Sequence, residues 1–93
     1  MRITDVRARL LRCESSQPIK FAHLEILSRS MILVEVETDT GIVGLGEIDA
    51  WPTGDQAAIS MVNGKFRNLL VNEEAGDIQR LWDKMYGLFI SPM

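Results

Sequence analysis

Apolar and polar residues alternate along three stretches in the first half of the chain. A period of two is typical of a strand that turns one face toward a core. The stretches comprise residues 2–12, 30–38 and 42–48. In the second stretch, Ile32, Val34 and Val36 share one face. Glu35 and Glu37 fall on the opposite face, so this stretch is the clearest of the three predicted strands.

A turn signal separates the second and third predicted strands. Residues 38–41, Thr-Asp-Thr-Gly, favour a tight turn in which Gly41 takes a positive φ. Two strands joined in this way form an antiparallel hairpin. Arg7 and Arg9 lie on the polar face of the first strand, so we expect them to meet the two glutamates of the second strand. Each such pair stabilises a sheet by about 0.2–1 kcal/mol.

Apolar residues recur at helical spacing in the second half of the chain. Residues 55–70 place six of them on one stripe, which predicts a helix capped by Thr53 or Asp55. These six are Ala58, Met61, Val62, Phe66, Leu69 and Leu70. The stripe is the face that we expect to pack against the sheet.

A second helix is predicted over residues 78–88, with Asp77 as a favourable N-cap. Its apolar face comprises Ile78, Leu81, Trp82, Met85 and Phe89. The spacing assigns Trp82 to the core. Strands followed by helices indicate an α+β fold, a three-stranded antiparallel meander followed by a helical bundle. We expect that bundle to be incomplete at its C-terminal end.

Two connections are predicted to be loops. Residues 14–28 begin with turn formers and continue with more apolar residues than loops usually contain. Residues 49–54 form the second loop, in which Trp51 precedes Pro52. Long loops in compact domains are often functional, so both connections are candidates for a ligand-binding role.

The totals fit one small folded domain of 93 residues with a formal charge of −3. That charge does not favour nucleic-acid binding, which usually requires a concentrated basic surface. The apolar runs are too short to span a membrane, and the start lacks the apolar core of a signal peptide. Cys13 is the only cysteine and is best explained as a small apolar filler. These features predict a cytoplasmic protein.

The acidic and glycine motifs offer little chemistry of their own. Gly44 and Gly46 lack the third glycine and the following helix of a dinucleotide fingerprint, so we interpret them as positions of close approach. Glu47 and Asp49 project to the same side of a strand, but the local sequence offers no further oxygen ligands for a metal. A solvated or ion-paired role explains these two acids better.

His23 and Trp51 are the remaining candidates. His23 is the only histidine, and no orienting partner of the kind that a general base needs is visible beside it. It is either a surface residue or a substrate contact in the apolar first loop. Trp51 is either a buried loop anchor or a wall of a ligand site. The chain alone therefore has no complete catalytic site.

Three segments, taken in order, resemble one family. Residues 1–6, Met-Arg-Ile-Thr-Asp-Val, resemble the opening strand of the mandelate racemase/muconate lactonizing branch of the enolase superfamily. Residues 34–47 resemble the family's hairpin, in which a turn ending in glycine leads to Gly-x-Gly-Glu. Residues 76–86, Gly-Asp-Ile-Gln-Arg-Leu-Trp-Asp-Lys-Met-Tyr, are similar to the helix that follows. The resemblance covers nearly the whole chain, residues 1–93, as an N-terminal capping domain.

The resemblance implies a role in an Mg²⁺-dependent racemase, cycloisomerase or acid-sugar dehydratase. In that family a (β/α) barrel holds Mg²⁺ through three carboxylates and abstracts the proton α to a substrate carboxylate. The N-terminal domain caps the barrel, and two of its loops line the substrate pocket. Here these loops correspond to residues 15–27 and 49–54, which makes Phe21, His23 and Trp51 the substrate-binding candidates.

The barrel is absent from this sequence, and with it the family's metal ligands and acid–base residues. We therefore assign this chain no catalytic residue, no metal ligand and no cofactor of its own, with Mg²⁺ expected in the parent enzyme. The expected partners are the C-terminal barrel domain, a small carboxylate substrate and further copies in a homo-oligomer. The alternative is an autonomous interaction or dimerisation module without enzymatic activity, since apolar faces that lack a barrel would favour self-association.

Overall fold

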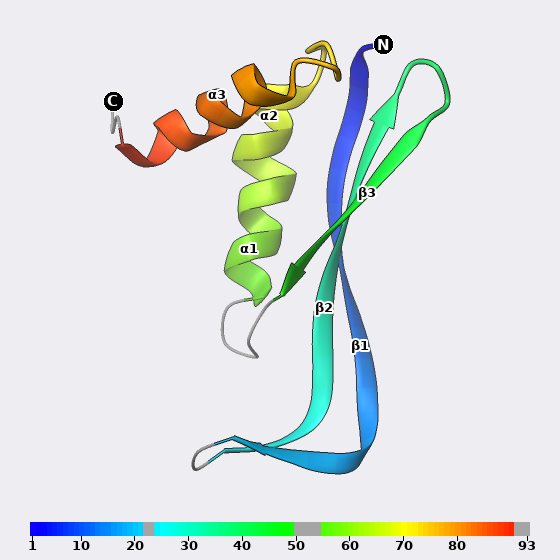
Figure 1. Cartoon of the computed structure of the whole chain (residues 1–93), viewed down its shortest axis with the longest axis vertical. Coiled ribbons are helices and arrows are strands. Elements are labelled where there is room, and N and C mark those ends of the chain that lie inside the picture. Colours follow the sequence, from blue (N-terminus) through cyan, green and yellow to red (C-terminus); the bar gives the residue numbers. More distant parts are fainter. Residues whose placement is uncertain (22–23, 50–54, 91–93) are drawn as a thin grey trace.

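The computed structural model describes residues 1–21, 24–49 and 55–90 of the chain. Side chains are described within residues 1–12, 31–49 and 55–87. The strands come first along the chain, and the helices follow (Figure 1).

Three strands form one antiparallel sheet in the order β1-β2-β3. β1 covers Ile3–Phe21, β2 covers Leu24–Thr38 and β3 covers Val43–Asp49. Consecutive strands are neighbours in space, as the hydrophobic alternation predicted. The predicted three-stranded meander is therefore confirmed.

The first two strands are much longer than the sequence pattern predicted. Residues 14–28 were expected to be a loop, but β1 continues to Phe21, β2 begins at Leu24, and the two strands pair as far as these residues. Pairing gives the backbone groups of a long connection the hydrogen-bond partners that they would otherwise lack. The register shifts between Glu14 and Ile19, a stretch that contains Pro18, which cannot donate a hydrogen bond to a ladder.

The connection between β2 and β3 is the tight turn that the sequence indicated. Gly41 has a φ of 85°, and its N–H donates to the carbonyl of Thr38 at 3.2 Å. The N–H of Thr38 donates in turn to the carbonyl of Ile42 at 3.1 Å. A residue with a side chain is strained at this φ, so glycine suits the position.

One continuous helical run follows β3 after the undescribed residues. It consists of α1 (Asp55–Met61), η1 (Val62–Phe66) and α2 (Arg67–Leu70). The middle segment is a π-helical turn, which the apolar spacing gave no reason to expect. The run ends before Asn72, whose φ of 73° lies in the left-handed region that asparagine tolerates.

The last helix, α3, covers Ile78–Ile90. The carbonyl of Asp77 accepts the N–H of Leu81 at 3.0 Å, so Asp77 occupies the start of the helix as predicted. Its carboxylate accepts a hydrogen bond from Arg80 at 3.1 Å. Strands followed by packed helices confirm the α+β fold class, and no helix among the described residues is long and apolar enough to cross a membrane.

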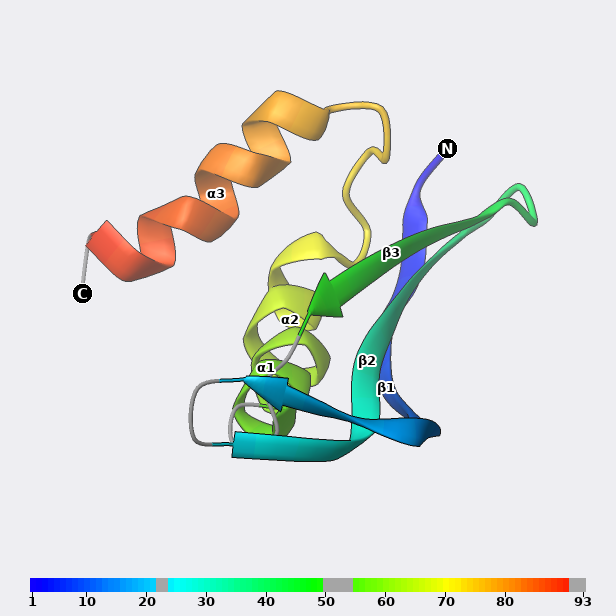
Figure 2. The same cartoon turned by 60° about the horizontal axis from the view of Figure 1, so that its bottom comes forward.

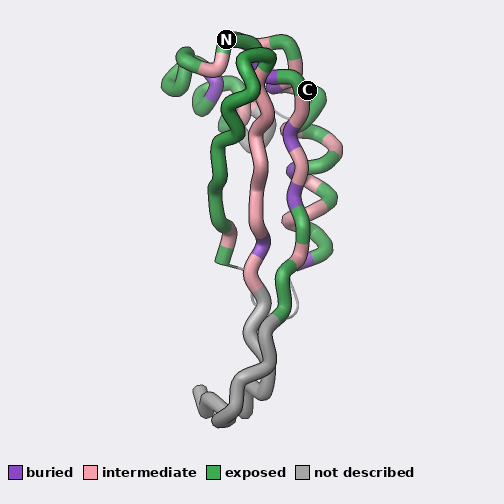
Figure 3. The backbone as a smooth tube through the Cα atoms, turned by 90° about the vertical axis from the view of Figure 1, so that its right-hand side faces the viewer, coloured by how far each residue is buried: buried purple, intermediate pink, exposed green. Residues whose placement is uncertain are grey.

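The core lies between the sheet and the helical run. The buried apolar residues are Ile3, Val6, Ala8, Ile32, Val62, Leu70 and Leu81. Figure 3 shows these positions gathered where strands and helices meet, whereas β3 is exposed over most of its length. Ile32 has no exposed surface, and full burial of such a side chain contributes about 1.5–3 kcal/mol.

Helix α3 contradicts part of the predicted core. Leu81 is buried and Met85 packs against the core, but Trp82 and Ile78 are exposed. The helix has the predicted apolar face, but the prediction that Trp82 on this face is buried was wrong. Helical spacing identifies a face that can be covered, and α3 meets α2 over only one edge of that face.

Candidate functional site

The segments that flank the two predicted cap loops lie on the side of the molecule away from the N-terminus. In Figures 1 and 2 the long β1–β2 hairpin turns in its lower half and approaches the start of α1. β3 ends beside the start of that helix, near the middle of the long axis in Figure 1, and the hairpin end at Phe21 and Leu24 lies below both. The N-terminus and the Gly41 turn lie at the opposite end.

Of the three predicted substrate-binding residues, Phe21 lies at the end of the described hairpin. His23 and Trp51 lie outside the described residues, so their geometry stays a prediction. Phe21 is described only by its backbone, which pairs with Leu24 at the tip of the described ladder. The fold shows only the flanking backbone, which lies on the side of the domain away from the N-terminus.

Asp55 is the buried charged residue among the described positions. Its Oδ1 accepts the N–H of Gln56 at 2.8 Å, and Oδ2 lies 3.9 Å from the guanidinium of Arg12 on β1. The aspartate therefore ties the first turn of α1 to the strand beside it. The sequence offered Thr53 or Asp55 as the cap, and Thr53 lies outside the described residues. The burial of Asp55 and its pairing with Arg12 depend on the tertiary fold.

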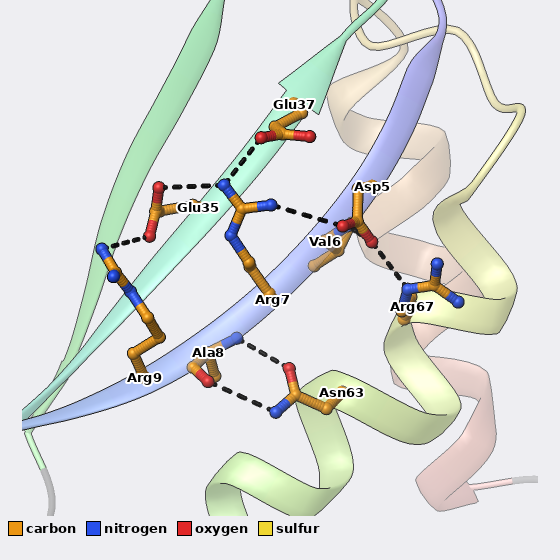
Figure 4. A network of polar contacts seen from close by, with 9 residues as sticks. All are labelled: Asp5, Val6, Arg7, Ala8, Arg9, Glu35, Glu37, Asn63 and Arg67. Atoms are coloured by element: carbon orange, nitrogen blue, oxygen red, sulfur yellow. Dashed lines mark hydrogen bonds and ion pairs between the residues drawn. The ribbon is translucent and has the colours of Figure 1, made fainter.

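A network of charged side chains covers the outer face of the sheet (Figure 4). Arg7 pairs with Glu37 at 2.6 Å and with Glu35 at 3.4 Å, and Arg9 pairs with Glu35 at 2.7 Å. The predicted meeting of these arginines and glutamates is confirmed. The hydrogen bond from Arg7 to Glu37 raises the pKa of the Arg7 guanidinium above its usual value.

The same network continues to the helical run through Asp5. Arg67 of α2 donates to Asp5 Oδ1 at 2.7 Å, and Arg7 lies 3.4 Å from Asp5 Oδ2. The hydrogen bond from Arg67 holds the pKa of the Asp5 carboxyl below its usual value. These carboxylates are engaged by guanidinium groups, and the described residues contain no cluster of three or more His, Cys, Asp or Glu side chains suited to a metal ion.

Asn63 forms a two-point contact with the first strand. Its Oδ1 accepts the N–H of Ala8 at 2.7 Å, and its Nδ2 donates to the carbonyl of Ala8 at 3.3 Å (Figure 4). The residue lies in η1, so the π-helical turn carries the side chain that binds the outer edge of β1. Sequence reasoning missed this contact, because an exposed asparagine on a helix gives no sign of a strand beside it.

The motif residues of β3 are exposed at the other edge of the sheet. Glu47 and Asp49 are both exposed, as the solvated interpretation requires. A Cβ at Gly44 would meet nothing closer than 4.0 Å, and one at Gly46 nothing closer than 3.9 Å. The predicted close approach at these glycines is therefore not made by any described residue of this chain.

Comparisons with known proteins agree with this architecture. The model of the mandelate racemase/muconate lactonizing enzyme N-terminal domain matches residues 3–92. The chain is 30% identical over 86 residues to D-galactarolactone cycloisomerase from Agrobacterium fabrum, covering 92% of this chain and 22% of that protein.

Solved structures show the same fold. A racemase from Streptomyces coelicolor A3(2) with bound magnesium superposes with a TM-score of 0.84 and 27% identity, covering 90% of this chain and 24% of that one. A member of the enolase superfamily from Polaromonas sp. JS666 gives a TM-score of 0.76 and 27% identity, covering 90% and 22%. The chain thus spans about a quarter of the length of the relatives that it matches.

Proposed function

This chain belongs to the mandelate racemase/muconate lactonizing enzyme family as its N-terminal domain, and from that premise we propose that it caps the active site of a larger enzyme. The activity proposed is that of an Mg²⁺-dependent racemase, cycloisomerase or acid-sugar dehydratase. Such an enzyme removes the proton α to the carboxylate of a small substrate. The reaction belongs to the C-terminal barrel domain, and this chain supplies closure and specificity.

The observation that supports this role is the placement of the described residues that flank the two connections. The hairpin bends beneath the start of α1, so its end at Phe21 and Leu24 and the described boundary residues Asp49 and Asp55 lie on the side of the domain away from the N-terminus (Figures 1 and 2). Loops that meet at one end of a scaffold can close over a single ligand, and barrel active sites lie at the end where such a cap would fit. Two loops at opposite ends could not share one substrate.

We assign three residues of these connections to substrate contact. Phe21 and Trp51 are proposed as apolar walls that exclude water, and His23 as a polar contact with the substrate. Excluding water strengthens the electrostatic interactions inside a closed site. The domain would therefore act by binding, orienting and enclosing the substrate, without taking part in the proton transfer.

The described residues do not fit an Mg²⁺ ion. Mg²⁺ prefers carboxylate and other oxygen ligands in octahedral geometry, whereas Asp5, Glu35 and Glu37 are already paired with arginines. We therefore assign the metal ligands to the C-terminal domain and no metal-dependent step to this chain. The structure of the Streptomyces racemase contains magnesium, which is consistent with such a site in the parent enzyme.

The test is the kinetics of the parent enzyme with substitutions in the cap. D-galactarolactone is the first substrate to try, because the cycloisomerase named for it is 30% identical to this chain. We expect His23→Ala and Trp51→Ala each to lower kcat/KM by about tenfold or more, as loss of a contact of about 1.4 kcal/mol would do. Thr40→Ala, at the opposite end of the sheet, is the matched control and should leave kcat/KM unchanged. Unchanged kinetics in the cap variants would contradict the proposal.

The alternative function, an autonomous interaction or dimerisation module, is not favoured by the family match. Homo-oligomerisation and a cytoplasmic location are proposed for the parent enzyme, to be checked by its mass in solution and by cell fractionation.

A further inference from the structure

Helix α3 exposes an apolar face built from Ile78, Trp82 and Tyr86. Their exposed fractions are 75%, 54% and 46%, which is high for large apolar side chains on one helix. The rings of Trp82 and Tyr86 stack, with centroids 5.0 Å apart and an interplanar angle of 14°. We call these three residues the α3 apolar face.

This face belongs to an apolar sector wider than the contact that α3 makes with the rest of the domain. At 3.6 residues per turn, Leu81, Met85 and the α3 apolar face together span about 140° of the helix surface. Leu81 is buried and Met85 packs against the core, whereas the other three positions point away. Surface helices usually turn an apolar stripe of about 100° or more toward a packing partner, so the exposed part of this sector is available to a second partner.

The orientation of α3 is fixed by polar contacts on its other side. Arg80 pairs with Glu73 at 2.7 Å, and Lys84 donates to the carbonyl of Leu69 at 2.9 Å. These bonds hold the helix against the end of α2 and the link that follows it. Turning the aromatic pair inward would break them, so the α3 apolar face stays directed outward.

The exposed apolar residues of β3 differ from this face. Val43 pairs with Glu37, and Leu45 pairs with Glu35, in the register of the sheet. Apolar side chains there are interspersed with charges, which is ordinary for a solvated sheet face. The α3 apolar face has no charged residue within its sector, and stacked Trp and Tyr side chains are the kind that anchor interfaces.

We propose that the α3 apolar face is the surface on which the polypeptide that follows this domain packs in the parent protein, an inference that rests on the proposed function. The matched family model is an N-terminal domain, and the relatives are about four times as long as this chain. The additional polypeptide therefore follows α3, the last element described here. Consecutive elements usually pack side by side, and this face lies next to the point where the chain continues.

The size of the face also favours a covalently attached segment over a second copy. Large side chains bury about 150–250 Å² each, so these exposed fractions offer on the order of 350 Å². A two-fold dimer through this face alone would bury on the order of 700 Å², below the roughly 1,200 Å² of stable interfaces. A segment of the same polypeptide avoids most of the entropy cost of association and needs less area.

The test is thiol labelling of the full-length parent protein carrying Ile78→Cys. The matched control is Asp83→Cys, an exposed position on the same helix outside the apolar sector. N-ethylmaleimide modification is followed by peptide mass spectrometry, which separates these thiols from Cys13. We expect the thiol at position 78 to react at least ten times more slowly than the one at position 83, at every protein concentration. Equal rates would overturn the proposal, and protection that disappears on dilution would overturn it in favour of a second copy.

Hydroxyl-radical footprinting of the unmodified parent keeps the test independent of folding defects in the variants. Low oxidation of Trp82 and Tyr86 in the native protein, rising on denaturation, is expected. Calorimetry of Mg²⁺ binding on the same sample separates the two proposals. If the parent protein binds Mg²⁺ but the thiol at position 78 reacts freely, only the docking proposal is contradicted. If position 78 is protected but no Mg²⁺ binds, only the proposed function is contradicted.

Discussion

The two edge strands of the sheet, β1 and β3, differ in how many hydrogen-bond partners their outer edges have. The outer edge of β1 is satisfied at several points: Ile3 exchanges hydrogen bonds with Glu73 and Asn72 at 2.9 and 2.8 Å, and Ala8 is held by Asn63. β3 pairs only with β2 among the described residues, and its other edge adjoins no further strand.

This difference shows how a small domain divides its surface. The β1 edge faces the helical run and the link after it, where the side chain of Asn63 and the backbone of Asn72 and Glu73 replace the missing strand. An open edge is a template for pairing with another chain, and natural proteins usually cover or charge it. β3 has acids only at its C-terminal end, Glu47 and Asp49, so its middle stays open to association.

The largest effect is expected when a valine is replaced by alanine in each of the two edge strands. Val6 in β1 is 2% exposed and Val43 in β3 is 44% exposed. We expect Val6→Ala to lower the free energy of unfolding by about 2 kcal/mol, because it empties a packed site. Val43→Ala should change it by less than about 0.5 kcal/mol. Urea unfolding measures both, and equal effects would remove the distinction between the edges.

The contact between Asn63 and Ala8 should have the next largest effect. Asn63→Ala removes two hydrogen bonds to the β1 edge and should cost about 1–2 kcal/mol of unfolding free energy. Asn68→Ala in α2 is the matched control, since it makes the same exchange at an exposed position of the same helical run. The two variants are compared by denaturant midpoint. A loss in the control as large as that in Asn63→Ala would attribute the effect to the helix and not to the edge.

Acid should weaken the β1 edge through Asp5. Because Arg67 lowers the folded-state pKa of Asp5, the ion pair stabilises the fold above the ordinary value of 3.8. That stabilisation is lost as pH falls through the lowered folded-state pKa. The effect is expected to be smaller than the two above, since water screens both groups. Stability measured from pH 7 to 2 should fall less steeply in Asp5→Asn than in the original chain, and parallel curves would count against it.

The smallest effect on stability is expected at the open edge, where association should respond instead. Leu45 is 71% exposed in the middle of β3. Leu45→Lys should leave the free energy of unfolding within about 0.5 kcal/mol of the original value. The added charge should reduce concentration-dependent self-association, because lysines on edge strands oppose pairing. Light scattering over a concentration series, with Thr40→Lys as the charge-matched control, distinguishes edge blocking from a general effect of charge.

Much of the fold could be predicted because local pattern and tertiary environment agree. The alternation of Ile32, Val34 and Val36 predicted a central strand, and the Thr-Asp-Thr-Gly segment predicted the turn at Gly41. Opposite charges on adjacent strands predicted the pairing of Arg7 with Glu35 and Glu37. In each case the short-range signal was sufficient.

The failures occur where a distant partner decides the outcome. Residues 14–28 contain turn formers and a proline, so alternation could not reveal that they pair with each other. Trp82 lies on an apolar stripe, but only a neighbouring element determines whether the stripe is covered. Asn63 binds a strand 55 positions earlier in the sequence, and no local rule links the two. The proposed substrate contacts depend on residues outside the described part and remain predictions.

The long β1–β2 hairpin has a mechanical consequence. Among the described residues β3 supports it as far as Met31, so the ribbon from there to Leu24 consists of two strands and measures about 23 Å along its length at roughly 3.3 Å per residue. Such ribbons twist more strongly than larger sheets. At that length, a change of about 5° in direction at the base displaces the far end by about 2 Å. Substitutions near the supported base can thus redirect the arm and change what it reaches, while the residues at the end stay the same.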